Sequence, residues 1–215
     1  YKQMGFENVV SIPNGIDLGG RESAVRGSEE PSGFRREVGD RNDGDYVIGC
    51  IARLSHDKGV DVLIDAVNEV PDANLKILGR GKEESNLRNQ INELNLSYRV
   101  SIENWIDDLN EFYKSIDLLA LPSREHDPFG LVAAEAIVRG IPVIVTDQCG
   151  IARHIEAGKD VLVVPAGSSG ALKEAIIELK DEEKRSWLAE SGKQKALAEF
   201  TVEKMVDRYE NLLIL

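Results

Sequence analysis

The sequence predicts an α/β fold, with a doubly wound parallel sheet of about six strands and helices on both faces. Two observations favour it: short apolar runs recur along the chain, and the segments between them have helical periodicity. Runs such as Leu118–Leu121 are apolar on both faces, which is typical of a buried parallel strand. The predicted strands cover 46–52, 75–79, 99–102, 118–121, 142–146 and 161–164.

The first 45 residues contain none of these runs. The chain opens at Tyr1 in what looks like a helix-loop-strand passage, so we expect a fragment of a longer protein, with 1–17 belonging to the preceding part. Residues 18–45 are rich in Gly, Ser, Arg and Glu, which predicts a linker, partly disordered, with one short helix at Phe34–Val38.

The helices are predicted from their apolar spacing. The segments are 60–67, 83–94, 171–179, 182–197 and 202–214, with Thr201 as the N-cap of the last one. We therefore expect one domain over 46–200 and a C-terminal helix within 201–215. In such a fold, ligands bind beyond the carboxyl ends of the strands, so the loops after the strands are the place to search.

Composition narrows the class of protein. Lys and Arg number 26 against 38 Asp and Glu, a net charge of −12 that argues against a nucleic-acid partner. No apolar run approaches the roughly 20 residues of a membrane span. Cys50 and Cys149 lack metal-ligand spacing, and we expect reduced thiols in a soluble, cytoplasmic protein, with a disulfide as the less favoured alternative.

The loop after the first strand carries two cations five residues apart, Arg53 and Lys58, just before a helix that begins near Val60. Two cations and a helix N-terminus at one turn can bind a diphosphate. Taken alone, the same residues also fit a solvated surface turn.

The loop after the second strand contains Gly79-Arg80-Gly81. Its glycines allow backbone to approach a ligand or a neighbouring segment. As a dinucleotide fingerprint it is incomplete, because the third glycine is absent, which disfavours a nicotinamide oxidoreductase. A tight turn into the next helix explains Gly79 at least as well as ligand contact.

The segment from Ser123 to Ala136 contains the most candidate ligand-binding residues. Asp127 is predicted to cap a helix that starts at Pro128, and Glu135 lies two turns further along. An acid in an apolar stretch is costly without a partner, which favours ligand contact for Glu135. Carboxylates that bind hydroxyls, together with cations and N–H groups that bind phosphates, are what a nucleotide sugar requires. We expect His126 to be an exposed loop residue and predict no metal site.

These motifs together resemble the retaining glycosyltransferases of family 4, which have the GT-B fold of two facing Rossmann-like domains. The resemblance covers nearly the whole chain, from Ile12 to Ile214. The matching stretches are Ile12–Asp17 as the interdomain passage, Ala52–Leu54, Lys58–Asp61, Pro128–Val132 with Glu135–Ala136, and Gly140–Ile144. It implies that 46–200 is the nucleotide-sugar-binding domain of the C-terminal half, separated from the N-terminal domain that holds the acceptor.

The resemblance also implies roles for individual residues. Arg53 and Lys58 would bind the donor diphosphate and stabilise the leaving nucleotide, Asp127 would contact the donor sugar or the reacting centre, and Glu135 would hold the ribose. The expected catalytic residues are thus Asp127, Arg53 and Lys58. The remaining expected donor-binding residues are Gly79, Trp105, Ile106, Glu125, Phe129, Gly130, Leu131 and Val132. Transfer would proceed with retention and without a metal.

Three positions depart from the family pattern. The first acid of its E-x7-E motif is normally Glu, whereas Asp127 stands there with Glu125 two residues earlier, so either acid could serve. Ala52 replaces a usual glycine before the Arg, and Arg153 stands where an acid is common.

The expected function is hexose transfer from a nucleotide diphosphate sugar to a saccharide or lipid-linked acceptor, in polysaccharide or glycoconjugate biosynthesis. UDP-glucose is the preferred donor, with GDP-mannose and UDP-N-acetylglucosamine as alternatives. The fragment alone should be weakly active or inactive, and membrane contact, if any, would involve the absent domain. Two other functions stay open: a nucleotide-sugar epimerase of GT-B shape, and a non-catalytic nucleotide-sugar-binding module.

Overall fold

The computed structural model describes residue 16 and residues 46–104, 106 and 109–213 of the 215-residue chain. The passage expected at 1–17 except Ile16, the linker at 18–45 with its short helix, and Trp105 lie outside the described residues.

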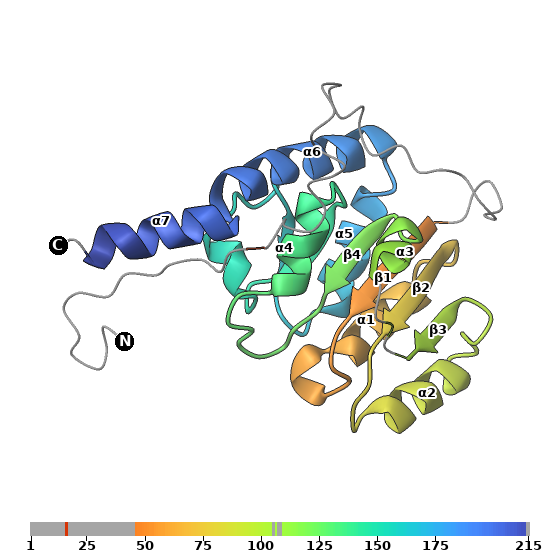
Figure 1. Cartoon of the computed structure of the whole chain (residues 1–215). Helices are drawn as coiled ribbons and strands as arrows, with labels where there is room; N and C mark the ends of the chain where they lie inside the picture. The colour runs from red at the N-terminus through yellow and green to blue at the C-terminus, as the bar shows by residue number, and fades with distance from the viewer. Residues whose placement is uncertain (1–15, 17–45, 105, 107–108, 214–215) are drawn as a thin grey trace.

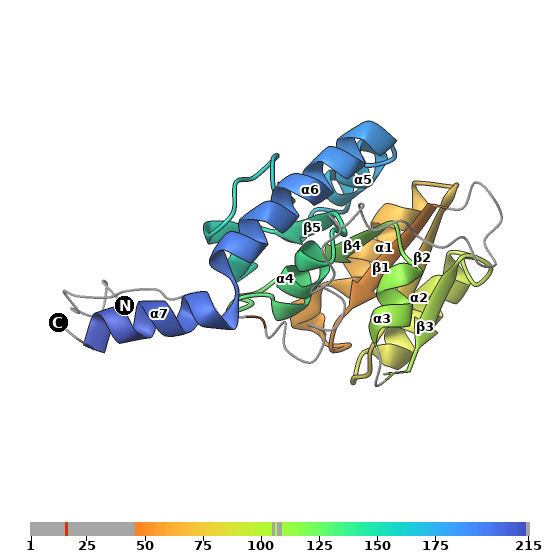
Figure 2. The same ribbon diagram turned by 45° about the horizontal axis from the view of Figure 1, so that its top comes forward.

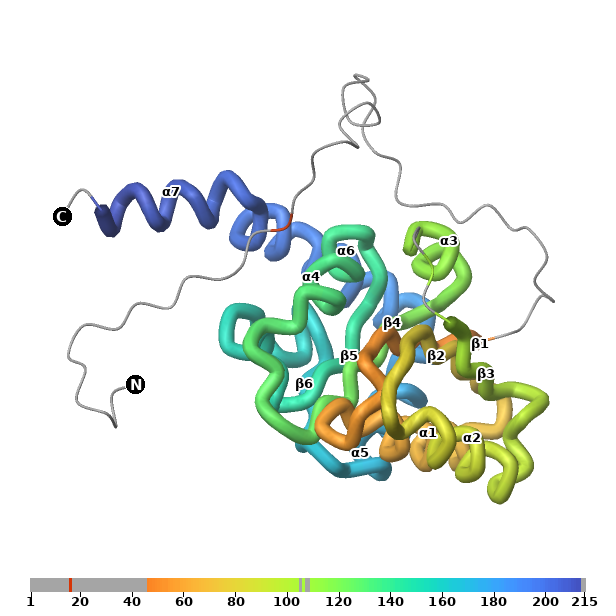
Figure 3. Tube along the Cα trace, turned by 60° about the horizontal axis from the view of Figure 1, so that its bottom comes forward, coloured from red at the N-terminus to blue at the C-terminus, as the bar shows by residue number. Residues whose placement is uncertain are grey.

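Six parallel strands form one sheet in the order β3-β2-β1-β4-β5-β6, with β3 and β6 at opposite edges (Figure 3). This confirms the predicted doubly wound sheet, because the strand order changes direction between β1 and β4. Each strand lies within two residues of its predicted run. The strands are β1 (Tyr46–Ile51), β2 (Ala73–Leu78), β3 (Val100–Glu103), β4 (Leu118–Leu121), β5 (Val143–Thr146) and β6 (Leu162–Val164).

Helices cover both faces of the sheet (Figure 1). One apolar core lies between the sheet and α1 (Val60–Asn68), α2 (Glu84–Glu93) and α5 (Ser169–Glu178). The second lies between the sheet and α3 (Leu109–Lys114) and α4 (Leu131–Val138). The long helix α6 (Glu182–Glu199) contributes to both cores. Within the described residues, the predicted helices are confirmed apart from the start of α4, while α3 is a helix that the sequence pattern did not reveal.

The last helix, α7 (Val202–Leu213), projects away from the sheet (Figure 2). Thr201 caps it as predicted, since its hydroxyl oxygen accepts a hydrogen bond from the backbone N–H of Lys204 at 3.3 Å. Ile16 forms a bridge with Thr201 at the junction of α6 and α7. Within the described residues, no helix is long and apolar enough to cross a membrane.

Candidate donor site

A cavity of about 330 Å³ opens beyond the carboxyl ends of β1 and β4, the two strands at which the sheet order reverses. One wall is the loop after β1 and the other is the loop after β4 with the start of α4. The lining residues are Ile51, Ala52, Arg53, Lys58, Leu121, Pro122, Ser123, Asp127, Pro128, Phe129, Gly130, Leu131 and Val132. The cavity therefore lies where doubly wound sheets bind ligands.

The two walls are attached to each other. The loop after β1 forms a short 3-10 helix, η3 (His56–Lys58), and ends at Gly59, whose φ of 64° is left-handed. A Cβ at Gly59 would lie 2.1 Å from the carbonyl oxygen of Pro122, so only glycine allows this close approach. The backbone N–H of Arg124 donates to the Asp57 carbonyl oxygen at 2.8 Å.

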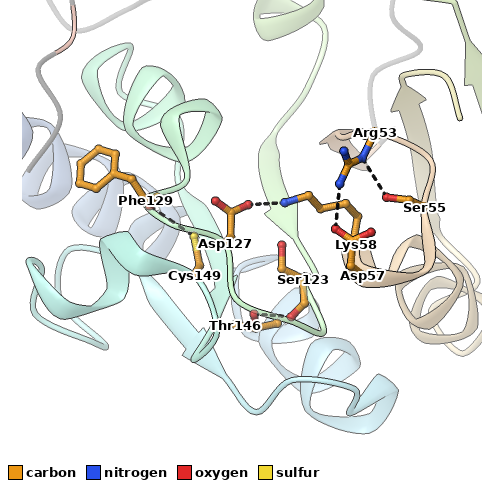
Figure 4. Close-up of polar contacts among 9 residues, drawn as sticks. All are labelled: Arg53, Ser55, Asp57, Lys58, Ser123, Asp127, Phe129, Thr146 and Cys149. Carbon is orange, nitrogen blue, oxygen red and sulfur yellow. Dashed lines mark hydrogen bonds and ion pairs between the residues drawn. The ribbon is translucent and has the colours of Figure 1, made fainter. Parts of the chain in front are cut away.

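Lys58 and Asp127 face each other across the cavity (Figure 4). The Lys58 Nζ lies 2.7 Å from the Asp127 Oδ2, and the two side chains are only 20% and 18% exposed. A partly buried pair with this geometry is held more firmly than a surface ion pair. The structure thus places one of the two predicted cations opposite a predicted acid.

Arg53 lies at the more open end of the same loop, with 69% of its side chain exposed. Its Nε donates to the Ser55 Oγ at 3.2 Å, and its Nη2 lies 3.2 Å from the Asp57 Oδ2 (Figure 4). The Ser55 hydroxyl, and after it the Arg53 guanidinium, hold the pKa of Asp57 below its ordinary value. Each predicted cation is therefore already paired with an acid, Arg53 within its own loop and Lys58 across the cavity.

The predicted helix start at Asp127 and Pro128 is wrong. Helix α4 begins at Leu131, and its N-cap is Gly130, which has a φ of 85° and no side-chain capping bond. The reason is tertiary: the Asp127 backbone forms a bridge with Cys149 instead of entering the helix. The Asp127 side chain is consequently available to Lys58.

The partner residue of this bridge, Cys149, directly precedes the short 3-10 helix η4 (Gly150–Arg153). The Asp127 N–H donates to the carbonyl oxygen of Gln148 at 3.0 Å, and its own carbonyl accepts from the Gly150 N–H at 2.8 Å. A Cβ at Gly150 would lie 2.0 Å from the Pro128 carbonyl oxygen. Close backbone packing therefore fixes this wall of the cavity.

Both cysteines are buried free thiols, as predicted. Burial raises the pKa of Cys50 to about 12 and that of Cys149 to about 11. Cys149 packs beneath the start of α4, where a Cβ at Gly130 would lie 2.4 Å from its Sγ. Neither thiol is suited to act as a nucleophile, because the reactive thiolate is disfavoured.

Among the predicted donor-binding residues that the structure describes, four do not line the cavity: Gly79, Ile106, Glu125 and Glu135. A Cβ at Gly79 would lie 1.9 Å from the Ala52 carbonyl oxygen, which favours its interpretation as a site of tight backbone packing. Ile106 packs against the core under α3 and α4, and Glu125 is exposed.

Glu135 is half-buried on α4, and its Oε2 accepts a hydrogen bond from the Tyr113 hydroxyl at 3.2 Å. The partner that an acid in this apolar stretch requires is thus a residue of α3.

Some contacts around the cavity could not be predicted. Arg124 forms a bidentate pair with Asp61 at 2.6 and 2.5 Å, although the two residues are 63 positions apart. The Thr146 Oγ1 donates to the Ser123 carbonyl oxygen at 2.7 Å (Figure 4). No sequence spacing signals either contact, because both depend on the order of the strands.

The three histidines lie outside the cavity lining. His56 and His126 are exposed, as expected for His126, and the His154 ring centroid is 6.1 Å from that of Phe129. Across the part of the chain that the structure describes, no three His, Cys, Asp or Glu side chains gather into a group that could hold a metal ion.

The sequence of the chain matches a known protein family. Residues 33–195 match the family model of the glycosyl transferases group 1. The chain is 32% identical over 168 residues to the lipopolysaccharide core biosynthesis glycosyltransferase LpsE of Rhizobium meliloti, covering 78% of this chain and 49% of LpsE.

A second relative is a GDP-mannose-dependent monoacylated alpha-(1-6)-phosphatidylinositol monomannoside mannosyltransferase of Corynebacterium glutamicum. It is 30% identical over 213 residues, which cover 94% of this chain and 55% of that enzyme. The chain thus spans about half the length of these curated relatives.

Solved structures of glycosyltransferases have a similar fold. Anabaena HepE in complex with UDP and glucose matches with a TM-score of 0.74 and 27% identity, over 79% of this chain and 48% of HepE. The C-terminal domain of the group 1 protein LpcC from Francisella tularensis shares the fold at a TM-score of 0.67 and 23% identity. That match covers 74% of this chain and 88% of LpcC's solved chain. The family model matches most of the chain, and the chain has a doubly wound sheet with a cavity at the strand switch point. This chain therefore belongs to the glycosyl transferases group 1 family.

Proposed function

We propose that the chain is the donor-binding half of a retaining glycosyltransferase, which transfers a hexose from a nucleotide diphosphate sugar to a saccharide or lipid-linked acceptor. The observation that carries the proposal is the Lys58 ammonium group, held by Asp127 inside a cavity at the strand switch point. A cation fixed there can bind a diphosphate directly. The acceptor site would belong to an N-terminal half outside this chain.

The proposed chemistry breaks the bond between the sugar C1 and the diphosphate oxygen and forms a bond from C1 to an acceptor oxygen on the same face. The nucleoside diphosphate leaves with the electron pair, and its departing oxygen takes up the proton that the acceptor hydroxyl loses. Negative charge then grows on the diphosphate, where Lys58 and Arg53 would stabilise it. The first N–H groups of α4 face no partner within the helix and would add to this stabilisation.

UDP-glucose remains our proposed donor. HepE binds UDP and UDP-glucose in its solved complexes and shares 27–28% identity with this chain. The name of the Corynebacterium relative instead specifies GDP-mannose, so GDP-mannose is the first alternative, followed by UDP-N-acetylglucosamine. We place the reaction in polysaccharide or glycoconjugate biosynthesis, in the cytoplasm and without a metal. The fragment alone would bind the donor and hydrolyse it slowly at most.

The proposal is tested by calorimetric titration of the chain with UDP-glucose, GDP-mannose, UDP-N-acetylglucosamine and NAD. One nucleotide sugar should bind, and Lys58→Ala should weaken its binding by about ten-fold or more, as expected when a charged hydrogen-bond donor is lost. Lys159→Ala is the matched control, because Lys159 pairs with Glu156 outside the cavity. Binding of NAD alone, or equal effects of the two variants, would contradict a donor site here.

Two other functions would give different results. An epimerase would need acid and base groups near the sugar, and none of the three histidines lines the cavity. A non-catalytic binding module would bind the donor equally well but would transfer no sugar after being rejoined to an N-terminal half.

A further inference from the structure

We infer that Tyr113 is a positioning residue for Glu135: its hydroxyl fixes the carboxylate that, by the family resemblance, would hold the donor ribose. The inference rests on the proposed function, with Glu135 as its ribose contact. Neither Glu135 nor Tyr113 lines the cavity, but Leu131 and Val132 at the start of α4 do, and Glu135 lies one helical turn beyond Leu131.

The contact joins two helices on the same face of the sheet. Tyr113 lies in α3 and is only 1% exposed, and Glu135 is half-buried in α4, 22 residues later. The Tyr113 hydroxyl donates to the Glu135 Oε2 at 3.2 Å. Among the described residues, the other oxygen, Oε1, has no hydrogen-bond partner. One carboxylate oxygen is therefore fixed while the second can accept a hydrogen bond from a ligand hydroxyl.

Arg139 holds the tyrosine ring in place. Its guanidinium carbon lies 4.6 Å from the centroid of the Tyr113 ring, and its Nη1 donates to the Glu135 carbonyl oxygen at 2.8 Å. The ring also has an edge contact with Phe112, with centroids 6.4 Å apart. Tyr113 thus has little freedom, so its hydroxyl is a fixed point for the carboxylate.

A fixed carboxylate matters for binding a hydroxyl. A half-exposed Glu side chain samples several rotamers, and ordering it on binding costs free energy. The Tyr113 hydrogen bond orders the side chain before the ligand arrives. The donor's ribose would therefore be recognised by a preorganised acid instead of a mobile one.

The test is Tyr113→Phe, which keeps the ring and its stacking but removes the hydroxyl. Calorimetry would measure the affinities of UDP and 2′-deoxyuridine diphosphate, and of GDP and its 2′-deoxy form. The affinity for the ribose form should fall by about three- to ten-fold, as for loss of one hydrogen bond to a charged group. The 2′-deoxy form should change little, so the preference for ribose should shrink.

Tyr46→Phe is a closely matched control. Tyr46 is also buried, and its hydroxyl donates a hydrogen bond to the carbonyl oxygen of Ile176 at 3.1 Å. The guanidinium carbon of Arg185 lies 5.6 Å from the centroid of its ring. Tyr46 lies at the opposite end of β1 from the cavity. Its variant should leave the ribose preference unchanged, which separates a general loss of packing from a specific effect.

The outcomes distinguish the inference from the proposed function. If Glu135→Gln reduces the ribose preference and Tyr113→Phe does not, the positioning role is overturned while the donor site stands. If Tyr113→Phe weakens ribose and deoxyribose forms equally, its role is structural only, which also overturns the inference. If neither diphosphate binds the unmodified chain, the proposed function fails and the inference falls with it. Support requires that Tyr113→Phe has no further effect in a Glu135→Gln background.

Discussion

Removing the negative charge of Asp127 tests how this carboxylate affects the binding of a diphosphate to Lys58. Asp127→Asn keeps the size of the side chain and the backbone bonds to Gln148 and Gly150. What it loses is the charge paired with the Lys58 Nζ at 2.7 Å. A diphosphate bound to Lys58 would lie beside this carboxylate, so Asp127 should oppose the binding of the bare nucleotide.

The expected size follows from the geometry. If a phosphate oxygen shares Lys58 with Asp127, two like charges about 5 Å apart in this partly exposed cavity repel by about 1–3 kcal/mol. Asp127→Asn removes this repulsion, which favours UDP binding, but part of the effect is offset because Lys58 loses the partner that orients it. We therefore expect Asp127→Asn to bind UDP about three- to ten-fold more tightly. UDP-glucose should gain less, since the proposed sugar contact of Asp127 is weakened.

The assay is calorimetric titration with UDP and UDP-glucose at low and high salt, with Glu125→Gln as the control. Glu125 is the neighbouring acid, but it is exposed and does not line the cavity. The gain in UDP affinity should shrink at high salt, because screening weakens charge repulsion. Weaker UDP binding by Asp127→Asn, or the expected gain in Glu125→Gln instead, would refute the reasoning.

Three further predictions concern stability. Arg99 is buried and donates hydrogen bonds to the carbonyl oxygens of four residues around the end of α1. Arg99→Met should therefore lower the free energy of unfolding, measured by urea denaturation, by about 3 kcal/mol. The control Arg80→Met changes an exposed arginine and should not lower it. Gly130→Ala should lower the free energy of unfolding by about 2–3 kcal/mol in the same assay, because the φ of Gly130 is 85° and the new Cβ would meet Cys149. Wild-type stability in this variant would contradict the close packing. Burial, and then the charges of nearby arginines, lower the pKa of His154, so the folded state binds fewer protons than the unfolded state below pH about 6.5. Stability should therefore fall as pH drops through that value, and thermal unfolding of His154→Gln should show a smaller fall.

Local patterns in the sequence predicted most of the fold. The run Leu118–Leu121 is β4 residue for residue, and Thr201 caps α7, because strand burial and helix capping each depend on a few neighbouring side chains. The short helix α3 was missed, since its six residues are too few to show a helical period.

The sequence by itself therefore determined the fold class, the family resemblance and the two loops that bound the cavity. Only the tertiary structure decided how their residues meet. It paired Lys58 with Asp127 and not Glu125, moved the start of α4 to Leu131, and brought the Tyr113 hydroxyl to Glu135. These contacts join segments from different strand crossovers, and their geometry follows from the order of strands in the sheet, which no local spacing of residues encodes.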